Sequence, residues 1–187
     1  MTESIPPPDS QLSGIWRRHW MIAALAGTAI AGGAGLAWQI ERSRQQSQTI
    51  DPGFWRLAFS TPDGLSLQMS ALRGRPLLLN FWATWCPPCV EELPLLSRFH
   101  EEYSSKGWQV LGLAVDQIDP VKRFLTQTRV SFPVALAGLS GVEISRSLGN
   151  SAGALPFTAV IEVGGAVHHR KMGRVTADEL RNWAALK

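Results

Sequence analysis

The sequence predicts an α/β domain with a central mixed sheet flanked by helices and an N-terminal β-hairpin, preceded by one transmembrane helix. Three observations lead to this prediction. From about residue 51 onward, apolar runs of strand length alternate with amphipathic helical segments. Residues 20–40 form an uncharged run that is rich in Ala and Gly. The only two cysteines, Cys86 and Cys89, lie where an apolar run gives way to a helical pattern.

Composition divides the chain into four regions. Consecutive prolines near the start are typical of a disordered tail. The uncharged run that follows has the length of about 20 residues that a helix needs to cross a bilayer. A polar stretch rich in Gln and Ser then has the composition of a spacer. We therefore expect a tail at 1–19, a transmembrane anchor at 20–40, a linker at 41–50 and the folded domain at 51–187.

A cleaved signal peptide is the alternative to the anchor. Trp16 and Trp20 at one end and Trp38 at the other favour a retained span, because tryptophans gather at membrane interfaces. Gly35–Ala37 would serve as a cleavage site in the alternative, and Arg17-Arg18 weakly resembles a twin-arginine export signal. The basic residues on both sides of the run are nearly balanced and do not fix its orientation. A redox-cycling cysteine pair favours an export compartment, so we expect a single-pass protein of the cytoplasmic membrane whose domain faces the periplasm or cell exterior.

The predicted domain begins with a hairpin and continues with alternating strands and helices. Pro62–Gly64 has the composition of the hairpin turn. The run 77–82 lacks alternation, which predicts a central strand buried on both faces. Pro94 should kink the helix that contains it, Asp119 is the expected N-cap of the next helix, and Thr176 begins a capping box. The predicted strands are 54–60, 65–69, 77–82, 109–115, 132–136, 158–163 and 166–171, and the predicted helices are 87–106, 120–129, 142–148 and 177–186.

The motif Cys86-Pro87-Pro88-Cys89 predicts a redox-active dithiol. Its short spacing lets the two sulfurs close a disulfide, and a helix N-terminus stabilises a thiolate on the first sulfur. Pro87 and Pro88 form the active-site turn and withhold two N–H groups. We expect Cys86 to be the exposed nucleophile and Cys89 the buried resolving thiol.

Other uses of the cysteines fit the sequence less well. A structural zinc site needs four ligands, and no second cysteine pair or suitably spaced histidine supplies them. Attachment of c-type haem requires histidine at the position of Val90.

The charges from residue 51 onward are scattered without a basic run, which argues against a nucleic-acid partner. His168 and His169 are expected to alternate across a strand and so to belong to no common site.

The residues around the dithiol resemble the thioredoxin-like superfamily. Residues 80–89, Asn-Phe-Trp-Ala-Thr-Trp-Cys-Pro-Pro-Cys, are similar to the family's active-site strand and turn. Pro94 matches the helix-kinking proline, and Leu155-Pro156 resembles the cis-proline loop that faces the dithiol. The Asp63-Gly64 hairpin and the run up to Pro94 are similar to the membrane-anchored TlpA/ResA branch, whose members reduce disulfides outside the cytoplasm. The resemblance covers about residues 54–187.

The resemblance implies roles for several residues. Asn80 stands where thioredoxin has a buried aspartate, so another group must accept the proton of Cys89. The candidate is Glu92, which lies three residues after Cys89 and on the same face of the helix, since a glutamate has that kind of role in the resembled branch. An ordinary first-turn acid is the alternative for Glu92. Leu155 and Pro156 are expected to pair with the client backbone and to keep metal away from the dithiol. Trp85 is expected to form an exposed platform for the client beside Cys86.

The expected function is reduction of disulfides in exported client proteins, with electrons from a membrane thiol donor. The resemblance makes apocytochrome c and copper-site proteins candidate clients, and the chemistry requires no small-molecule cofactor. A disulfide-introducing oxidant of the same fold is one alternative. The other is a Cu(I)-binding module, because soft thiolates suit that ion, although the motif lacks a third ligand.

Overall fold

Strand β4, Leu77–Trp82, lies at the centre of a mixed sheet. The computed structural model describes residues 48–185 of the chain. All six residues of β4 are buried, as the uninterrupted apolar run predicts. The strand pairs in parallel with β5, Gln109–Ala114, and antiparallel with β7, Phe157–Ile161. The dithiol motif directly follows the carboxyl end of this central strand.

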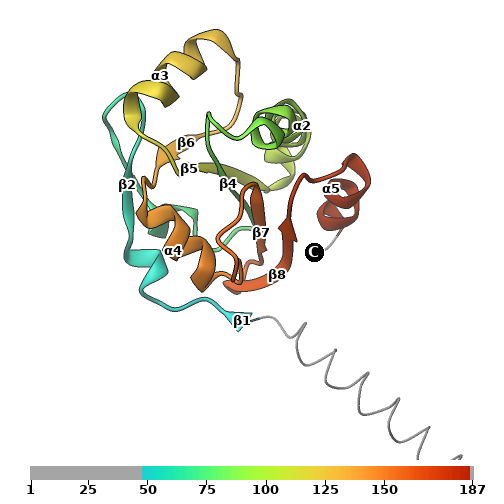
Figure 1. Cartoon of the computed structure of the whole chain (residues 1–187). Coiled ribbons are helices and arrows are strands. Elements are labelled where there is room, and N and C mark those ends of the chain that lie inside the picture. Colours follow the sequence, from blue (N-terminus) through green and yellow to red (C-terminus); the bar gives the residue numbers. More distant parts are fainter. Residues whose placement is uncertain (1–47, 186–187) are drawn as a thin grey trace, which may run out of the picture. The chain divides into compact units, whose positions relative to one another are not determined.

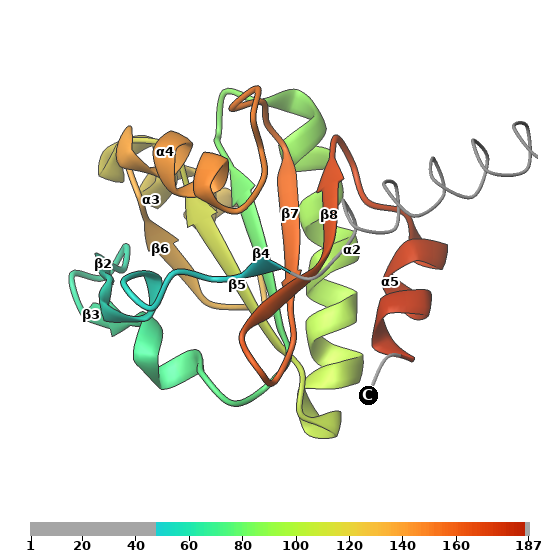
Figure 2. The ribbon, with the colours of Figure 1, turned by 90° about the horizontal axis from the view of Figure 1, so that it is seen from below.

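The described residues form eight strands in the order β1-β8-β7-β4-β5-β6-β2-β3. Figure 2 shows the hairpin of β2 and β3 at one side and β8 at the other. The remaining strands are β1 Gln48–Thr49, β2 Ala58–Ser60, β3 Ser66–Gln68, β6 Val134–Leu136 and β8 Ala166–Met172. The helices are α2 Pro87–Tyr103, α3 Ile118–Gln127, α4 Ser140–Ser147 and α5 Ala177–Ala184, and the 3-10 turns are η1 Phe54–Arg56, η2 Met69–Leu72 and η3 Ser104–Lys106.

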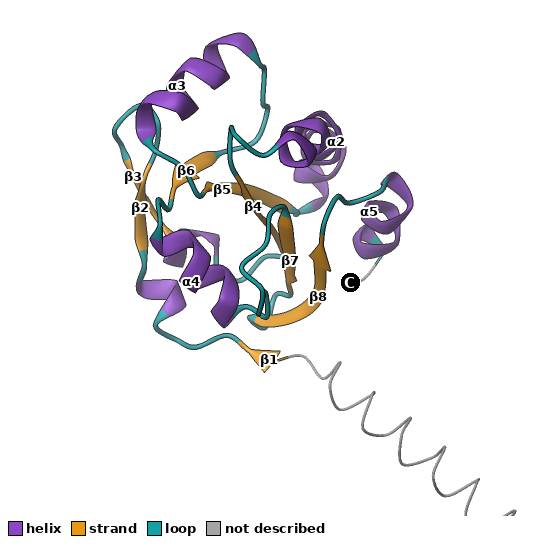
Figure 3. Ribbon diagram, viewed as in Figure 1, coloured by secondary structure: helices purple, strands orange, loops and turns teal. Residues whose placement is uncertain are grey.

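Helices cover both faces of the sheet, as predicted. On one face, α2, α3 and α5 lie over an apolar cluster that includes Trp82, Leu93 and Trp183. On the other face, α4 and the turns η1 and η2 cover a second cluster built on Phe81 and Phe157 (Figures 1 and 3). Burial of these two apolar layers is the main driving force that holds the sheet between its helices.

The predicted order of elements is confirmed, with shifted boundaries. The hairpin pairs Ala58 with Gln68, but its first strand is shorter than expected because Phe54–Arg56 turns as a 3-10 helix and buries its aromatic side chains. The prediction of Asp119 as an N-cap is wrong, since α3 starts at Ile118 with Gln117 as its N-cap. Pro120 then lies in the first turn of α3, where backbone N–H groups have no acceptor within the helix, so the missing N–H of proline costs no helical hydrogen bond. The last helix has the predicted capping box at Thr176.

The two histidines do not alternate as expected. The register pairs Val160 with His169 and Ile161 with Val167, so a β-bulge leaves His168 as the extra residue. The two imidazole rings consequently contact each other, with centroids 4.4 Å apart. Within residues 48–185, no group of three His, Cys, Asp or Glu side chains could hold a metal ion.

Most of the predicted N-terminal regions lie outside the described residues. This applies to the tail at 1–19, the anchor at 20–40 and most of the linker at 41–50. The described end of that linker is not a free spacer, because Gln48 and Thr49 pair with β8 as strand β1. No helix in the described part of the chain is both long and apolar enough to span a bilayer.

Candidate active site

The two cysteines occupy the first turn of α2. Cys86 is the N-cap with extended backbone, and Pro87 and Pro88 take the next two positions, where a proline sacrifices no helical hydrogen bond. The backbone N–H groups of Cys89 and Val90 both donate to the carbonyl of Cys86. The sulfurs of Cys86 and Cys89 are joined in a disulfide. The structure is therefore that of the oxidised protein, with the pair at the positive end of the helix dipole.

Exposure of the two cysteines differs from the prediction. Cys89 is 0% exposed, as expected for a buried thiol, but Cys86 is only 5% exposed. The expectation of an exposed Cys86 is thus wrong for this oxidised form, because the bonded side chain packs within the apolar cluster that also contains Ala83 and Cys89. Cys86 nonetheless lines a surface groove beside the helix start.

Glu92 is a buried carboxyl on the next turn of the same helix. It is 1% exposed. Its Oε1 accepts a hydrogen bond from Asn80 Nδ2 at 2.8 Å, and its Oε2 accepts one from the Val175 backbone N–H at 3.0 Å. Burial raises the pKa of Glu92, while the two hydrogen bonds and the charge of Arg174 oppose that rise. A carboxylate whose pKa is raised binds a proton more tightly than an exposed carboxylate does, so Glu92 is better suited to accept a proton from a thiol.

Asn80 connects Glu92 to the rest of the sheet. Its side-chain amide also donates to Thr158 Oγ1 at 3.0 Å, so strand β4 is tied through polar groups to both α2 and β7. The Oδ1 atom of Asn80 is buried and has no hydrogen-bond partner among the described residues. The arrangement orients the Asn80 amide as a donor to the glutamate. Sequence reasoning places these two residues near the dithiol, and the structure brings them into direct contact.

The groove beside Cys86 is wide and largely apolar, with a volume of about 780 Å³. Trp85, at 66% exposed, and Leu139, at 89% exposed, are two exposed large apolar side chains that border it. Leu155 contributes from the opposite loop, and the peptide bond between Leu155 and Pro156 is cis, as the resemblance implies. Within residues 48–185, no hydrogen bond engages the backbone N–H or carbonyl of Leu155.

Comparison with known proteins identifies the family. The family model named Redoxin matches residues 49–185. The chain belongs to the Redoxin family. It is similar to the thiol-disulfide oxidoreductase ResA of Bacillus thuringiensis (strain Al Hakam) and to that of Bacillus anthracis, each 33% identical over 122 residues that cover 65% of this chain and 68% of the relative. This Redoxin chain is a ResA-like thiol-disulfide oxidoreductase.

Solved structures agree with the fold of this Redoxin domain. A thioredoxin-related protein from Neisseria meningitidis serogroup B is 29% identical, with a TM-score of 0.61 over 70% of this chain and 97% of that one. A protein described as a putative thiol:disulfide interchange protein DsbE, from Chlorobium tepidum, is 25% identical, with a TM-score of 0.61 over 72% and 96%. The domain therefore has the thioredoxin-like fold expected from its sequence.

One contact that braces the active-site turn of the Redoxin domain escaped the sequence analysis. The Asp116 carboxylate accepts hydrogen bonds from Thr84 N at 2.9 Å and from Thr84 Oγ1 at 2.6 Å. It also accepts one from the Gln117 backbone N–H at 2.7 Å. Asp116 thereby holds the loop after β5 against the turn that leads to Cys86. The sequence did hold a signal for this contact. Asp116 follows β5, which is parallel to β4, and the carboxyl ends of parallel strands lie at the same edge of the sheet, so Asp116 could have been expected near the dithiol turn.

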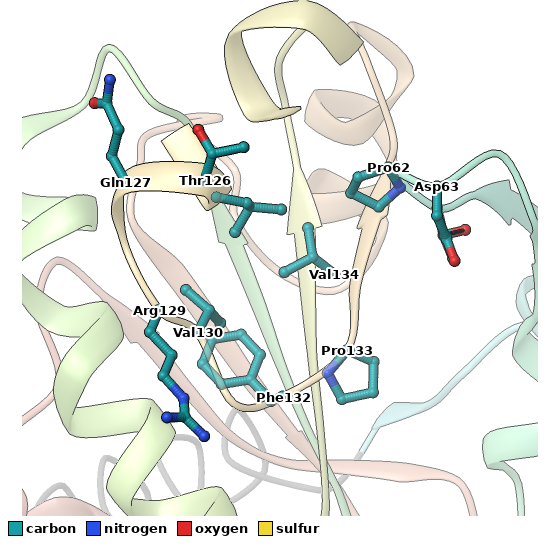
Figure 4. A pocket seen from close by; sticks show the side chains of 11 residues that line it. Pro62, Asp63, Thr126, Gln127, Arg129, Val130, Phe132, Pro133 and Val134 are labelled. Atoms are coloured by element: carbon teal, nitrogen blue, oxygen red, sulfur yellow. Dashed lines mark hydrogen bonds between the residues drawn. The ribbon is translucent and has the colours of Figure 1, made fainter. Parts of the chain in front are cut away.

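A second hollow of about 540 Å³ lies beside strand β6 of the Redoxin sheet. It is bordered by the hairpin turn at Pro62 and Asp63, by the end of α3, and by Phe132 and Pro133 ahead of β6 (Figure 4). Val134 lines the hollow and is level with Gly112 of β5 and Asn80 of β4, so the hollow lies on the β6 side of the sheet and shares no lining residue with the groove at Cys86. The ionisable side chains that line the hollow are Asp63 and Arg129, and neither is a redox group. The groove at Cys86 is therefore the better candidate for disulfide chemistry.

Proposed function

We propose that this protein reduces disulfides in client proteins outside the cytoplasm, through its Cys86–Cys89 pair and from a membrane anchor at residues 20–40. The observation that carries the proposal is the placement of the pair at the start of α2, with Cys86 lining an apolar groove and Cys89 fully buried. A disulfide substrate approaching through the groove meets Cys86 first. The relatives named thiol-disulfide oxidoreductase ResA support the same chemistry.

The first step is attack by the Cys86 thiolate on a client disulfide. The client S–S bond breaks, one client sulfur leaves as a thiolate, and the other forms a mixed disulfide with Cys86. The position of Cys86 at the helix N-terminus favours its thiolate. The client thiolate that leaves takes up a proton from water.

The second step closes the cycle within the protein. Cys89 gives its proton to Glu92, three residues along the same helix, and its thiolate attacks the Cys86 sulfur. The mixed disulfide breaks, Cys86 and Cys89 become joined, and the second client thiolate leaves and takes up a proton from water, while Glu92 returns its proton to water. In total, two electrons and two protons pass to the client. A membrane thiol donor then reduces the pair again by the same exchange.

The groove suits an extended polypeptide with apolar side chains. Trp85 and Leu139 offer exposed apolar surface, and Leu155 offers a backbone N–H and a carbonyl that have no hydrogen-bond partner within residues 48–185. Among the described residues that line the groove, Asp116 is the one ionisable residue besides Cys86, and it already accepts three hydrogen bonds. Oxidised cysteine pairs of apocytochrome c and of copper-site proteins are the client classes that we propose on the strength of the ResA resemblance.

The reduction potential of the pair tests the direction of electron flow. The purified chain is equilibrated with glutathione or dithiothreitol buffers, and the fraction of disulfide is measured at each ratio. A reductant should give a potential well below about −200 mV. A value near about −120 mV, in the range of strong oxidants, would reverse the proposed direction.

A further inference from the structure

Asn150 is a fully buried polar residue in the loop that leads to the cis peptide bond. It follows the end of α4, where Gly149 has a left-handed backbone with φ of +108°. Its own N–H donates to the carbonyl of Ser145 at 3.0 Å, and its carbonyl accepts from the N–H of Gly153 at 2.9 Å. The backbone of Asn150 thus joins the helix end to the loop that borders the groove.

The side chain of Asn150 clasps both polar backbone groups of Ala154. Its Oδ1 accepts from Ala154 N–H at 3.2 Å, and its Nδ2 donates to the Ala154 carbonyl at 2.8 Å. The second hydrogen of Nδ2 is directed to Ser145 Oγ at 3.1 Å. Both donors and the acceptor of the amide are therefore used, as expected of a buried polar group that specifies one conformation.

The clasp determines which backbone N–H and carbonyl groups of the loop remain available to bind a client. Ala154 is satisfied internally, and the carbonyl of Pro156 accepts from Gly173 N–H at 2.9 Å. Between them, Leu155 has no internal hydrogen bond among the described residues, and it lines the same groove as Cys86. Gly153 allows the tight turn of this loop. Its φ of +64° is left-handed, and a Cβ at this position would lie 3.0 Å from the Val142 side chain.

We propose that Asn150 is a positioning residue for client binding: it holds Ala154 so that the backbone N–H and carbonyl of Leu155, which have no partner among the described residues, are presented beside Cys86. The inference rests on the proposed exchange with polypeptide clients. Asparagine is required because only an amide of this length supplies both a donor and an acceptor. Aspartate would replace the donor with a buried anion facing the Ala154 carbonyl, and alanine would leave both groups of Ala154 without their partner.

Two substrates separate client positioning from disulfide chemistry. The reduced chain is mixed either with a disulfide-linked peptide or with dithiobis(nitrobenzoic acid), a small disulfide that has no peptide backbone. The Asn150→Ala variant should react with the peptide about 10- to 100-fold more slowly, while its rate with the small disulfide falls far less. Ser145→Ala is the matched control, because it removes a partner of Asn150 without touching the contacts to Ala154.

Equal losses with both substrates, or no loss with either, would overturn the proposal. Failure of the unaltered chain to reduce any disulfide would instead count against the proposed function. Amide hydrogen exchange of the unaltered chain tests the clasp independently of both activity and variant folding. Protection of Ala154 N–H with rapid exchange at Leu155 N–H is the expected pattern, and the reverse pattern would refute the clasp.

Discussion

Replacement of Glu92 by glutamine should make the protein more stable at neutral pH and slower as an enzyme. The carboxylate accepts one hydrogen bond on each oxygen, from Asn80 and from Val175. Glutamine keeps one acceptor and turns an NH2 group toward a donor, which costs about 1–3 kcal/mol for the hydrogen bond that is lost. Against this, the substitution removes the need to bury a charge. Burial raises the pKa of Glu92 despite both hydrogen bonds, so the folded protein disfavours the charged form, and we expect relief of this buried charge to outweigh the lost hydrogen bond.

The sign of the pH dependence follows from the raised pKa. Below the ordinary value of 4.5, Glu92 is protonated in both the folded and the unfolded chain and contributes no penalty. As pH rises through that value, the unfolded chain ionises first, and stability falls until the folded group also ionises. Each unit by which the folded pKa is raised costs about 1.4 kcal/mol at the upper end of this window. Glu92→Gln has no such loss, so its advantage should grow with pH.

Denaturant unfolding of the oxidised chain at about pH 4 and about pH 8 measures this difference. Glu91→Gln is the matched control, because Glu91 is an exposed neighbour whose carboxylate pairs with Arg174 at 2.6 Å. We expect that surface change to alter stability by less than about 1 kcal/mol. A Glu92→Gln variant that is less stable than the parent at about pH 8 would show that the hydrogen bonds dominate and that the carboxylate is chiefly structural.

The same variant tests the proposed proton transfer. Loss of a general base typically lowers a rate by at least about 100-fold, so resolution of a preformed mixed disulfide at Cys86 should slow by that order. The rate should also lose the pH dependence that the Glu92 carboxyl confers. Stopped-flow measurement of resolution across pH provides the test. An unchanged rate and pH profile would remove Glu92 from the mechanism.

Two further predictions concern the turn and the groove. Asp116→Ala leaves Thr84 without its acceptor and should lower the free energy of unfolding by about 1–3 kcal/mol, measured by denaturant titration; an effect near zero would show that the brace is dispensable. Leu139→Ser removes an apolar side chain that is 89% exposed and should leave stability nearly unchanged while slowing exchange with an apolar peptide disulfide. Unaltered peptide kinetics would exclude Leu139 from client binding.

Local patterns were sufficient to predict much of this fold. The apolar run at 77–82 identifies the central strand because burial on both faces leaves no room for polar residues. The capping box at Thr176 is a contact between residues three apart, so it is visible in the sequence itself. The position of Cys86 at a helix start follows from the change of pattern after Trp82. The cis bond before Pro156 required the family resemblance, since most bonds to proline are trans.

Contacts between distant segments could not be predicted in this way. The low exposure of Cys86 depends on how the disulfide packs against its apolar neighbours. The meeting of His168 and His169 depends on a β-bulge, and one inserted residue in the pairing reverses the expected faces. The braces formed by Asp116 and Asn150 join loops through side chains whose partners are fixed only when the chain has folded.

The most direct test of the account is to trap the client on each cysteine in turn. Cys89→Ala and Cys86→Ala chains, both reduced, are incubated with a client that carries one disulfide, and covalent adducts are separated and mapped by mass spectrometry. The account predicts a stable mixed disulfide between the client and Cys86 in the Cys89→Ala chain, and no adduct in the Cys86→Ala chain. An adduct on Cys89, or no adduct in either chain, would contradict it.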